Sequence, residues 1–328
     1  MIIYVLFISI ALLASVLSSP IKFPPRESSN GTTYSGTSTL VTLKNDIAEV
    51  TIDIGRGCSI IGFADTSSNT NVINSYDLGR EVQASFYSGP SNYDNCVWSG
   101  QPWTWNPIGA GDCHGNPSTV LSQSVSDDGF SLTCEIIPKQ WACDNVDCEC
   151  TFAITYTLQE NMVHSQITLN NQRSDKIDYG VFDQEVPAVY VNGFLYRLFA
   201  YVGDNPWQGD TLTEFDAGFD TFWVPGKVNV DETWMAFASQ TDYSLGVYQS
   251  STNGLFLAGF SGKKGSGGPS DAPTGYIAPI AELDVTADMV YSYDYVLAIG
   301  NLPDIRNIFY NLHNQEQEGK SLHEIFNQ

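Results

Sequence analysis

The sequence predicts an all-β protein, a large antiparallel β-sandwich that ends in a short helix. Three observations predict this class. Apolar residues alternate with polar or small residues at a period of two through most of the chain, and helix signals are scarce before residue 303. Turn-rich connections join the alternating segments, which favours antiparallel neighbours. The predicted strands include residues 48–54, 130–136, 150–158, 163–169, 234–239, 245–249, 255–260 and 290–299.

The N-terminal residues predict export. Residues 1–19 are apolar and uncharged and end in small residues, which is typical of a signal peptide, and Pro20 follows directly. An uncleaved membrane anchor is the alternative, although the apolar run is short for a spanning helix. Residues 20–38 form a polar leader that carries a glycosylation sequon at Asn30, and residues 39–302 form the sandwich. The mature chain is therefore expected to be secreted or lumenal, with no membrane association.

Residues 303–328 are expected to form a C-terminal helix and tail. Pro303 suits the first turn of a helix, and Ile305, Phe309 and Leu312 recur at helical spacing. The polar tail from residue 314 onward is expected to fray.

Charge and cysteine content narrow the partners. The net charge of −23 argues against nucleic acid and against anionic polymers. Seven cysteines in an exported chain predict disulfides, with one thiol left over. Cys96 and Cys113 flank a Trp-rich loop, so we expect a bridge between them. For the cluster Cys143, Cys148 and Cys150, a zinc site is the less favoured alternative to disulfides, because no histidine lies within it.

The Trp-rich segment, residues 76–115, predicts a carbohydrate-binding cleft. Aromatic rings stand there beside hydrogen-bonding side chains, in a stretch dense in Gly and Pro. Flat apolar rings suit the C–H face of a sugar, and the polar groups suit its hydroxyls. The candidate substrate-binding residues in this segment are Arg80, Gln83, Tyr87, Trp103, Trp105 and Asn106. Arg80 is equally well explained by a structural ion pair with Asp77 or Glu81.

A second candidate segment begins at Asp183-Gln184-Glu185. Pro187 follows, which indicates an edge or loop-entry position, and Gln184 and Tyr190 are further candidates for substrate binding. Hydrolysis of a glycoside needs two carboxylates about 5–10 Å apart. Glu185 is the first candidate. Asp112, Asp77 and Asp204 compete for the second place, and Asp112 is preferred. The alternative for Glu185 is a structural acceptor of loop N–H groups.

His114 completes the predicted catalytic set. It titrates near neutral pH and lies in the Gly-flanked run GDCHG beside Asp112. Its alternative is an ordinary loop histidine. We see no nucleophile elbow, no phosphate-binding loop and no zinc-protease helix, and the sequence predicts neither a metal nor a cofactor.

Several motifs together carry a family resemblance. GRGCSIIGFAD and VINSYDLGREVQASFYSGP resemble the entry strands of galactose-mutarotase-like β-supersandwich proteins, and WNPIGAGDCHG, QEVPAVY and GGPSDAPTGYIAP resemble an uncharacterised secreted group. The resemblance covers about residues 46–300. It implies a supersandwich fold that serves sugar epimerases, polysaccharide lyases and noncatalytic domains of glycosidases.

Three functions follow as expectations. The favoured one is a secreted glycoside hydrolase that acts through paired carboxylates on a poly- or oligosaccharide. The second is a polysaccharide lyase, in which Tyr87 or His114 takes the proton and Arg80 neutralises the substrate carboxylate. The third is a lectin-like module that binds glycans without reaction.

Overall fold

The computed structural model describes residues 39–90, 93–216 and 227–327. The predicted signal peptide, the leader and Asn30 lie outside this part of the chain. Within the described residues, no helix has both the length and the apolarity to cross a bilayer.

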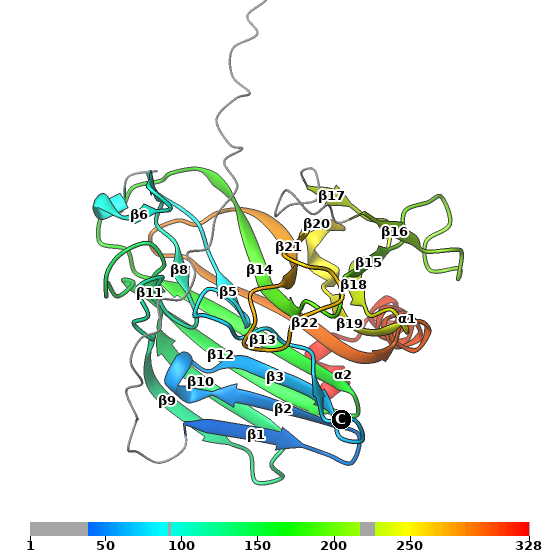
Figure 1. Cartoon of the computed structure of the whole chain (residues 1–328). Coiled ribbons are helices and arrows are strands. Elements are labelled where there is room, and N and C mark those ends of the chain that lie inside the picture. The colour runs from blue at the N-terminus through cyan, green and yellow to red at the C-terminus, as the bar shows by residue number, and fades with distance from the viewer. Residues whose placement is uncertain (1–38, 91–92, 217–226, 328) are drawn as a thin grey trace, which may run out of the picture.

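Two large antiparallel sheets pack face to face (Figure 1). The predicted antiparallel β-sandwich is therefore confirmed. The larger sheet has the order β1 (Leu40–Lys44), β2 (Ala48–Asp53), β3 (Ser59–Asp65), β5 (Val82–Ser85), β14 (Val181–Asn192), β21 (Thr274–Asp284), β20 (Leu255–Ser261) and β17 (Val228–Asn229), with β4 (Thr70–Asn71), β8 (Pro107–Ile108) and β11 (Lys139–Gln140) attached beside this path.

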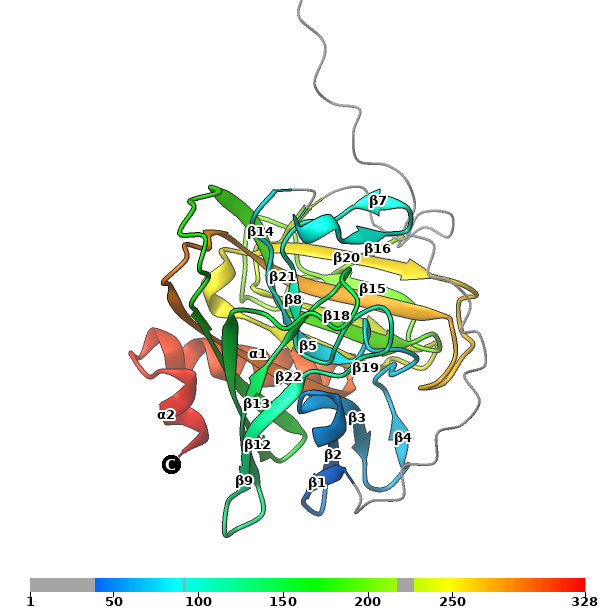
Figure 2. The same cartoon turned by 90° about the vertical axis from the view of Figure 1, so that its left-hand side faces the viewer.

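The smaller sheet has the order β16 (Thr213–Phe215), β15 (Arg197–Ala200), β18 (Trp234–Ala238), β19 (Tyr243–Tyr248), β22 (Val290–Asn301), β13 (Met162–Asn171), β12 (Cys150–Gln159), β10 (Ser131–Ile137) and β9 (Thr119–Val125). A separate hairpin of β6 (Val97–Trp98) and β7 (Gln101–Pro102) projects from the Trp-rich segment (Figures 1 and 2). The short 3-10 helices are η1 (Ile54–Arg56), η2 (Tyr93–Asn95) and η3 (Ser250–Thr252).

The core between the sheets follows from the alternation in the sequence. In β2, Ala48, Val50 and Ile52 are fully buried, while Glu49 and Thr51 between them are only partly buried. Because successive strand residues point to opposite faces, each strand gives one side to this core and the other to the outside. The outer face of the larger sheet is therefore free to carry polar side chains.

The outer face of the smaller sheet is covered by two helices, which lie together on one side of the molecule in Figure 2. Helix α1 (Leu302–Gln317) begins at the predicted proline, and its buried stripe packs against β18, β19 and β22. Gly246 on β19 permits this approach, because a Cβ there would lie 2.6 Å from Phe309.

The tail does not fray as expected. Helix α2 (Leu322–Phe326) follows α1, and Ser321 and Glu324 form a reciprocal capping box at its start. Leu322, Ile325 and Phe326 are buried against the smaller sheet. The capping box and these three apolar residues stabilise the helix. The polar residues around them make the segment read as an irregular tail in the sequence.

Three disulfides are present: Cys58–Cys134, Cys96–Cys143 and Cys148–Cys150. The predicted Cys96–Cys113 bridge is wrong, and Cys113 is the leftover thiol. The pairing of β8 with β11 brings the residues that follow β11 in the sequence alongside Cys96. Among them, Ala142 O accepts a hydrogen bond from Val97 N–H at 3.2 Å. This long-range contact places Cys143, rather than the nearer Cys113, opposite Cys96.

Candidate functional site

The candidate site lies on the outer face of the larger sheet, where β5, β14 and β21 run side by side. Glu185 on β14 is opposite Ser85 on β5 and Ile280 on β21, and Tyr190 is opposite Tyr276. Residues that alternate with these, such as Val82, Val189 and Ile277, are in the core. An irregularity in β14 between Glu185 and Val189 shifts the alternation by one residue. Ser85, Glu185, Tyr190 and Tyr276 therefore point to the same outer side.

Glu185 is enclosed by hydroxyl groups. Burial raises the pKa of its carboxyl group, while hydrogen bonds from Tyr276, Ser85 and Tyr87 act in the opposite direction. The residue keeps partial contact with solvent, as does Tyr87, whereas Tyr276 is fully buried. The site is thus a carboxyl group at the surface end of a buried hydroxyl cluster.

The tyrosines of this cluster are neutral hydrogen-bond donors. Burial, and next the nearby Glu185 carboxylate, raises the pKa of Tyr87, Tyr190 and Tyr276 well above the ordinary value. The rings of Tyr190 and Tyr276 pack with centroids 4.7 Å apart. A phenol held in this state donates a proton in a hydrogen bond but does not act as a base near neutral pH.

A second carboxylate lies on the same face. Asp183 precedes Glu185 by two residues on β14, and its register partner on β21 is Glu282. Residues i and i+2 of a strand point to the same face, and their Cα atoms are about 7 Å apart. Lys227 Nζ lies 2.7 Å from Asp183 Oδ1 and 2.9 Å from Glu282 Oε1, so one ammonium group bridges both carboxylates. Asp183 is about one-third exposed and accessible to solvent.

Arg80 and Gln83 brace the loops beside this face. Arg80 is 2% exposed, and its Nη1 donates to Ala272 O at 2.9 Å and to Asp271 O at 3.4 Å. Gln83 donates to Arg80 O at 2.7 Å and accepts from Ala110 N–H at 2.7 Å. Arg80 Nε also lies 3.5 Å from Asp77 Oδ2, so the structural ion pair with Asp77 is present, whereas Glu81 pairs with Arg56. These contacts give both side chains a bracing role rather than a ligand-facing one.

Gln184 and Asn106 are also buried. Gln184 faces away from Glu185, accepts from Tyr87 N–H at 2.7 Å and donates to Tyr87 O at 3.0 Å. These two bonds resemble the pair that a neighbouring strand backbone would make with Tyr87. They fix the backbone that carries the Tyr87 ring. Asn106 is 1% exposed and connects the Trp-rich segment to Ser85, as described below.

The two predicted stacking tryptophans differ in position. Trp105 is fully buried in the main core, where no ring face is open to a ligand. Trp103 is half-buried and packs beside Trp98 and Trp141 around the Cys96–Cys143 bridge. Of the two, only Trp103 keeps an accessible ring.

Asp112 and His114 lie apart from the Glu185 cluster in their contacts. Asp112 is 1% exposed and accepts four hydrogen bonds, from His114 N–H, Asn116 N–H, the Asn116 amide and Asn145 N–H, at 2.7–2.9 Å. His114 is exposed at the surface of the same loop. Asp112 therefore organises a loop, and the structure does not bring it together with Glu185.

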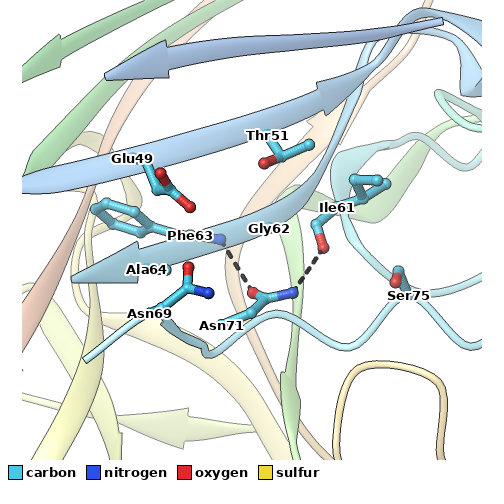
Figure 3. A pocket seen from close by; sticks show the side chains of 9 residues that line it. All are labelled: Glu49, Thr51, Ile61, Gly62, Phe63, Ala64, Asn69, Asn71 and Ser75. Carbon is cyan, nitrogen blue, oxygen red and sulfur yellow. Dashed lines mark hydrogen bonds between the residues drawn. The ribbon is translucent and has the colours of Figure 1, made fainter. Parts of the chain in front are cut away.

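A shallow hollow, open to solvent, lies over Gly62 on β3 (Figure 3). Thr51 of β2 and Asn71 of β4 flank it, and Asn71 bonds the β3 backbone at Phe63 N–H and Ile61 O. Glu49 at its rim is paired with Lys44 at 2.8 Å. The Phe63 ring that borders it is fully buried, so the hollow offers polar groups without an exposed ring.

Sequence reasoning missed two members of the cluster, Ser85 and Tyr276. Tyr276 lies in the run TGYIAP and is in phase with Ala278 and Ile280, which marks one face of a strand. Its neighbourhood with Glu185 depends on the pairing of β14 with β21, for which the sequence carries no local signal.

Comparisons with known proteins add the following. No family model matches the chain, and no curated protein matches its sequence. Among solved structures, a galactose mutarotase related enzyme from Lactobacillus acidophilus is 12% identical, with 80% of this chain and 97% of that chain covered and a TM-score of 0.48. A galactose mutarotase-like protein from Clostridium acetobutylicum is 10% identical, with 80% and 95% covered and a TM-score of 0.43.

An alpha-mannosidase from Enterococcus faecalis is also similar, at 11% identity and a TM-score of 0.47, with 86% of this chain and 31% of that chain covered. The chain is thus similar in structure to galactose mutarotase-like proteins, as its motifs predict. At such low identity, the assignment of a site depends on the residues of this chain.

Proposed function

We propose that this chain is a secreted glycoside hydrolase whose active site lies around Glu185. The observation that carries the proposal is the Glu185 carboxyl group with its raised pKa, which contacts the hydroxyls of Tyr87, Ser85 and Tyr276 at a solvent-facing position. A carboxyl group with a raised pKa suits a general acid that protonates a leaving oxygen. Neutral phenols beside it suit the hydroxyls and ring faces of a sugar.

Asp183 replaces Asp112 as the proposed second carboxylate. It shares a face with Glu185 at a Cα spacing of about 7 Å. Side chains that leave one strand face at this spacing can reach the carboxyl separation of about 5–10 Å that glycoside hydrolysis uses. The Lys227 ammonium group lies 2.7 Å from Asp183 Oδ1 and holds the side chain at this face. Glu185 would then act as the acid, with Asp183 as the nucleophile or base.

The lyase alternative has less support. It needs a base near neutral pH and a cation for the substrate carboxylate. The raised pKa of Tyr87 counts against it as the base, and His114 lies on the separate Asp112 loop. The bonds of Arg80 to the carbonyls of residues 271 and 272 count against Arg80 as the cation. The net charge of −23 also repels a polyuronate.

Export is supported by the cysteines. Six of the seven form disulfides, which persist in oxidising compartments. We therefore propose that residues 1–19 are removed and that the mature chain meets its glycan outside the cell or in a lumenal compartment.

The test is product analysis with the mature chain and neutral hexose and N-acetylhexosamine oligosaccharides. New reducing ends support hydrolysis. An unsaturated product that absorbs in the near ultraviolet, or retention without cleavage, contradicts it. Asp183→Asn should lower turnover by at least ~10²-fold. Asp112→Asn is the matched control, and it should lower the melting temperature while the folded fraction keeps its turnover.

A further inference from the structure

A buried hydrogen-bond chain connects the Trp-rich segment to the candidate site. Trp103 Nε1 donates to Asn106 Oδ1 at 3.1 Å. The Asn106 amide nitrogen donates to Phe86 O at 2.8 Å and to Ser85 Oγ at 3.2 Å. Asn106 and Ser85 are each 1% exposed, so water does not compete for these bonds.

In the hydrogen bonds from Trp103 through Asn106 to Ser85, each group can be assigned as donor or acceptor in only one way. An indole N–H can only donate, so the Asn106 atom that faces Trp103 must be the oxygen. A backbone carbonyl can only accept, so the atom that faces Phe86 must be the nitrogen. The orientation of the Asn106 amide is therefore fixed by both contacts. Ser85 Oγ must accept the hydrogen bond from the Asn106 amide nitrogen.

Ser85 then has its own hydroxyl proton left to give. Ser85 on β5 is the register partner of Glu185 on β14, and its hydroxyl hydrogen-bonds the Glu185 carboxyl group and the Tyr87 hydroxyl. In the ionised cluster, the carboxylate is the one member that carries no proton, so the chain of donation ends on Glu185.

We propose that Asn106 is a positioning residue that fixes the Ser85 hydroxyl as a hydrogen-bond donor to Glu185. This inference rests on the proposed function only where it assumes that Glu185 is catalytic. Asn106 is thus a candidate for positioning rather than for substrate binding, because it lies behind Glu185 and contacts it through Ser85.

Other charged and titratable groups also face Glu185. Ser85→Ala, Ser59→Ala and Asn106→Ala leave this set unchanged, and Asn106→Asp adds one carboxyl group to it. Tyr87 approaches from the segment after β5 and Tyr276 from β21, and Asp183 lies beside it on β14. Tyr190 lies near Glu185 as well, and Arg80 and Asp77 act on Tyr190.

The experiment is a ¹³C NMR titration of the glutamate side-chain carboxyl groups of the full mature chain. The Glu185 signal is assigned by its loss in Glu185→Gln. Three variants follow: Asn106→Asp, Ser85→Ala, and Ser59→Ala as a matched control. Ser59 is a buried strand serine, 2% exposed, on β3 of the same sheet.

Ser85→Ala removes one donor from the carboxylate, so the proton affinity of Glu185 should rise about tenfold, which equals ~1.4 kcal/mol. Asn106→Asp puts an acceptor where the amide donor was. The Ser85 hydroxyl should then donate to this acceptor instead of to Glu185. The proton affinity of Glu185 should rise at least as much as in Ser85→Ala. Ser59→Ala should leave the titration unchanged. If Asn106→Asp fails to fold, Asn106→Ala removes the same donor without a charge and should shift the titration in the same direction.

An unshifted Glu185 titration in Ser85→Ala, or in the folded Asn106 variant, overturns the proposal. Because the titration needs no substrate, it is independent of the proposed activity. A chain that cleaves no glycan but shows the predicted shifts loses the hydrolase assignment and keeps the positioning role of Asn106. If turnover is found, the acid limb of its pH profile should move with the same titration.

Discussion

Glu81 gives a stability prediction that follows directly from burial. Its side chain is fully buried just before β5, and Arg56 Nη1 lies 2.6 Å from its Oε1. Burial raises the pKa of Glu81 to about 8, because the loss of hydration outweighs the attraction of Arg56. The Arg56 side chain is about one-third exposed, which weakens that attraction.

The raised pKa fixes the sign of the pH dependence. Between the ordinary value of 4.5 and about 8, the folded chain holds a proton on Glu81 that the unfolded chain releases. The free energy of unfolding therefore falls as pH rises, by about 1.4 kcal/mol per pH unit for this one group. Glu81→Gln is neutral in both states and keeps an oxygen that can accept from Arg56, so it lacks this contribution.

The assay is urea denaturation of the wild type and Glu81→Gln at pH 5, 6 and 7, with the disulfides intact. The difference in unfolding free energy should shift in favour of the variant by about 2–3 kcal/mol from pH 5 to pH 7. Taking the difference cancels the groups that the two proteins share. A difference that is constant across this range would show that Glu81 titrates normally and would refute the reasoning.

Three further predictions concern the rest of the fold. Replacing both Cys96 and Cys143 by serine opens a loop with a sequence separation of 47 and should cost about 4 kcal/mol in the chain-entropy model, measured by urea denaturation; no loss would contradict it. Gly246→Ala should cost about 1–3 kcal/mol because its Cβ meets Phe309, and an unchanged melting temperature would show that α1 can shift. Burial raises the pKa of Cys113 to about 12, so iodoacetamide near pH 8 should label it far more slowly in the folded than in the unfolded chain, and equal rates would contradict this.

Much of the fold was predictable because it depends on local periodicity. The alternation around Ala48–Ile52 and along β12 and β13 identifies strands, since one side of each strand must be apolar to form the core. Helix α1 was predicted by its proline and its apolar stripe. Helix α2 was missed because a five-residue helix carries little periodic signal.

The site was predictable only in its centre. Glu185 was selected from its Pro-broken, Tyr-flanked context, but its partners Ser85 and Tyr276 come from strands distant in sequence. Asp112 and Trp105 have the residue types of a sugar site and face inward all the same. Residue type gives chemistry, whereas strand register and face decide which groups meet, and register depends on long-range pairing.

Turnover and melting of Glu185→Gln, measured on the same preparation beside the wild type, test the central claim most directly. The substitution keeps the shape and removes the proton that the carboxyl group would transfer. If Glu185 is the acid, turnover of the cleaved oligosaccharide should fall by at least ~10²-fold while the melting temperature and glycan affinity change little. A variant that is fully active, or one that loses stability while its folded fraction turns over normally, would show that Glu185 has no role in the chemistry.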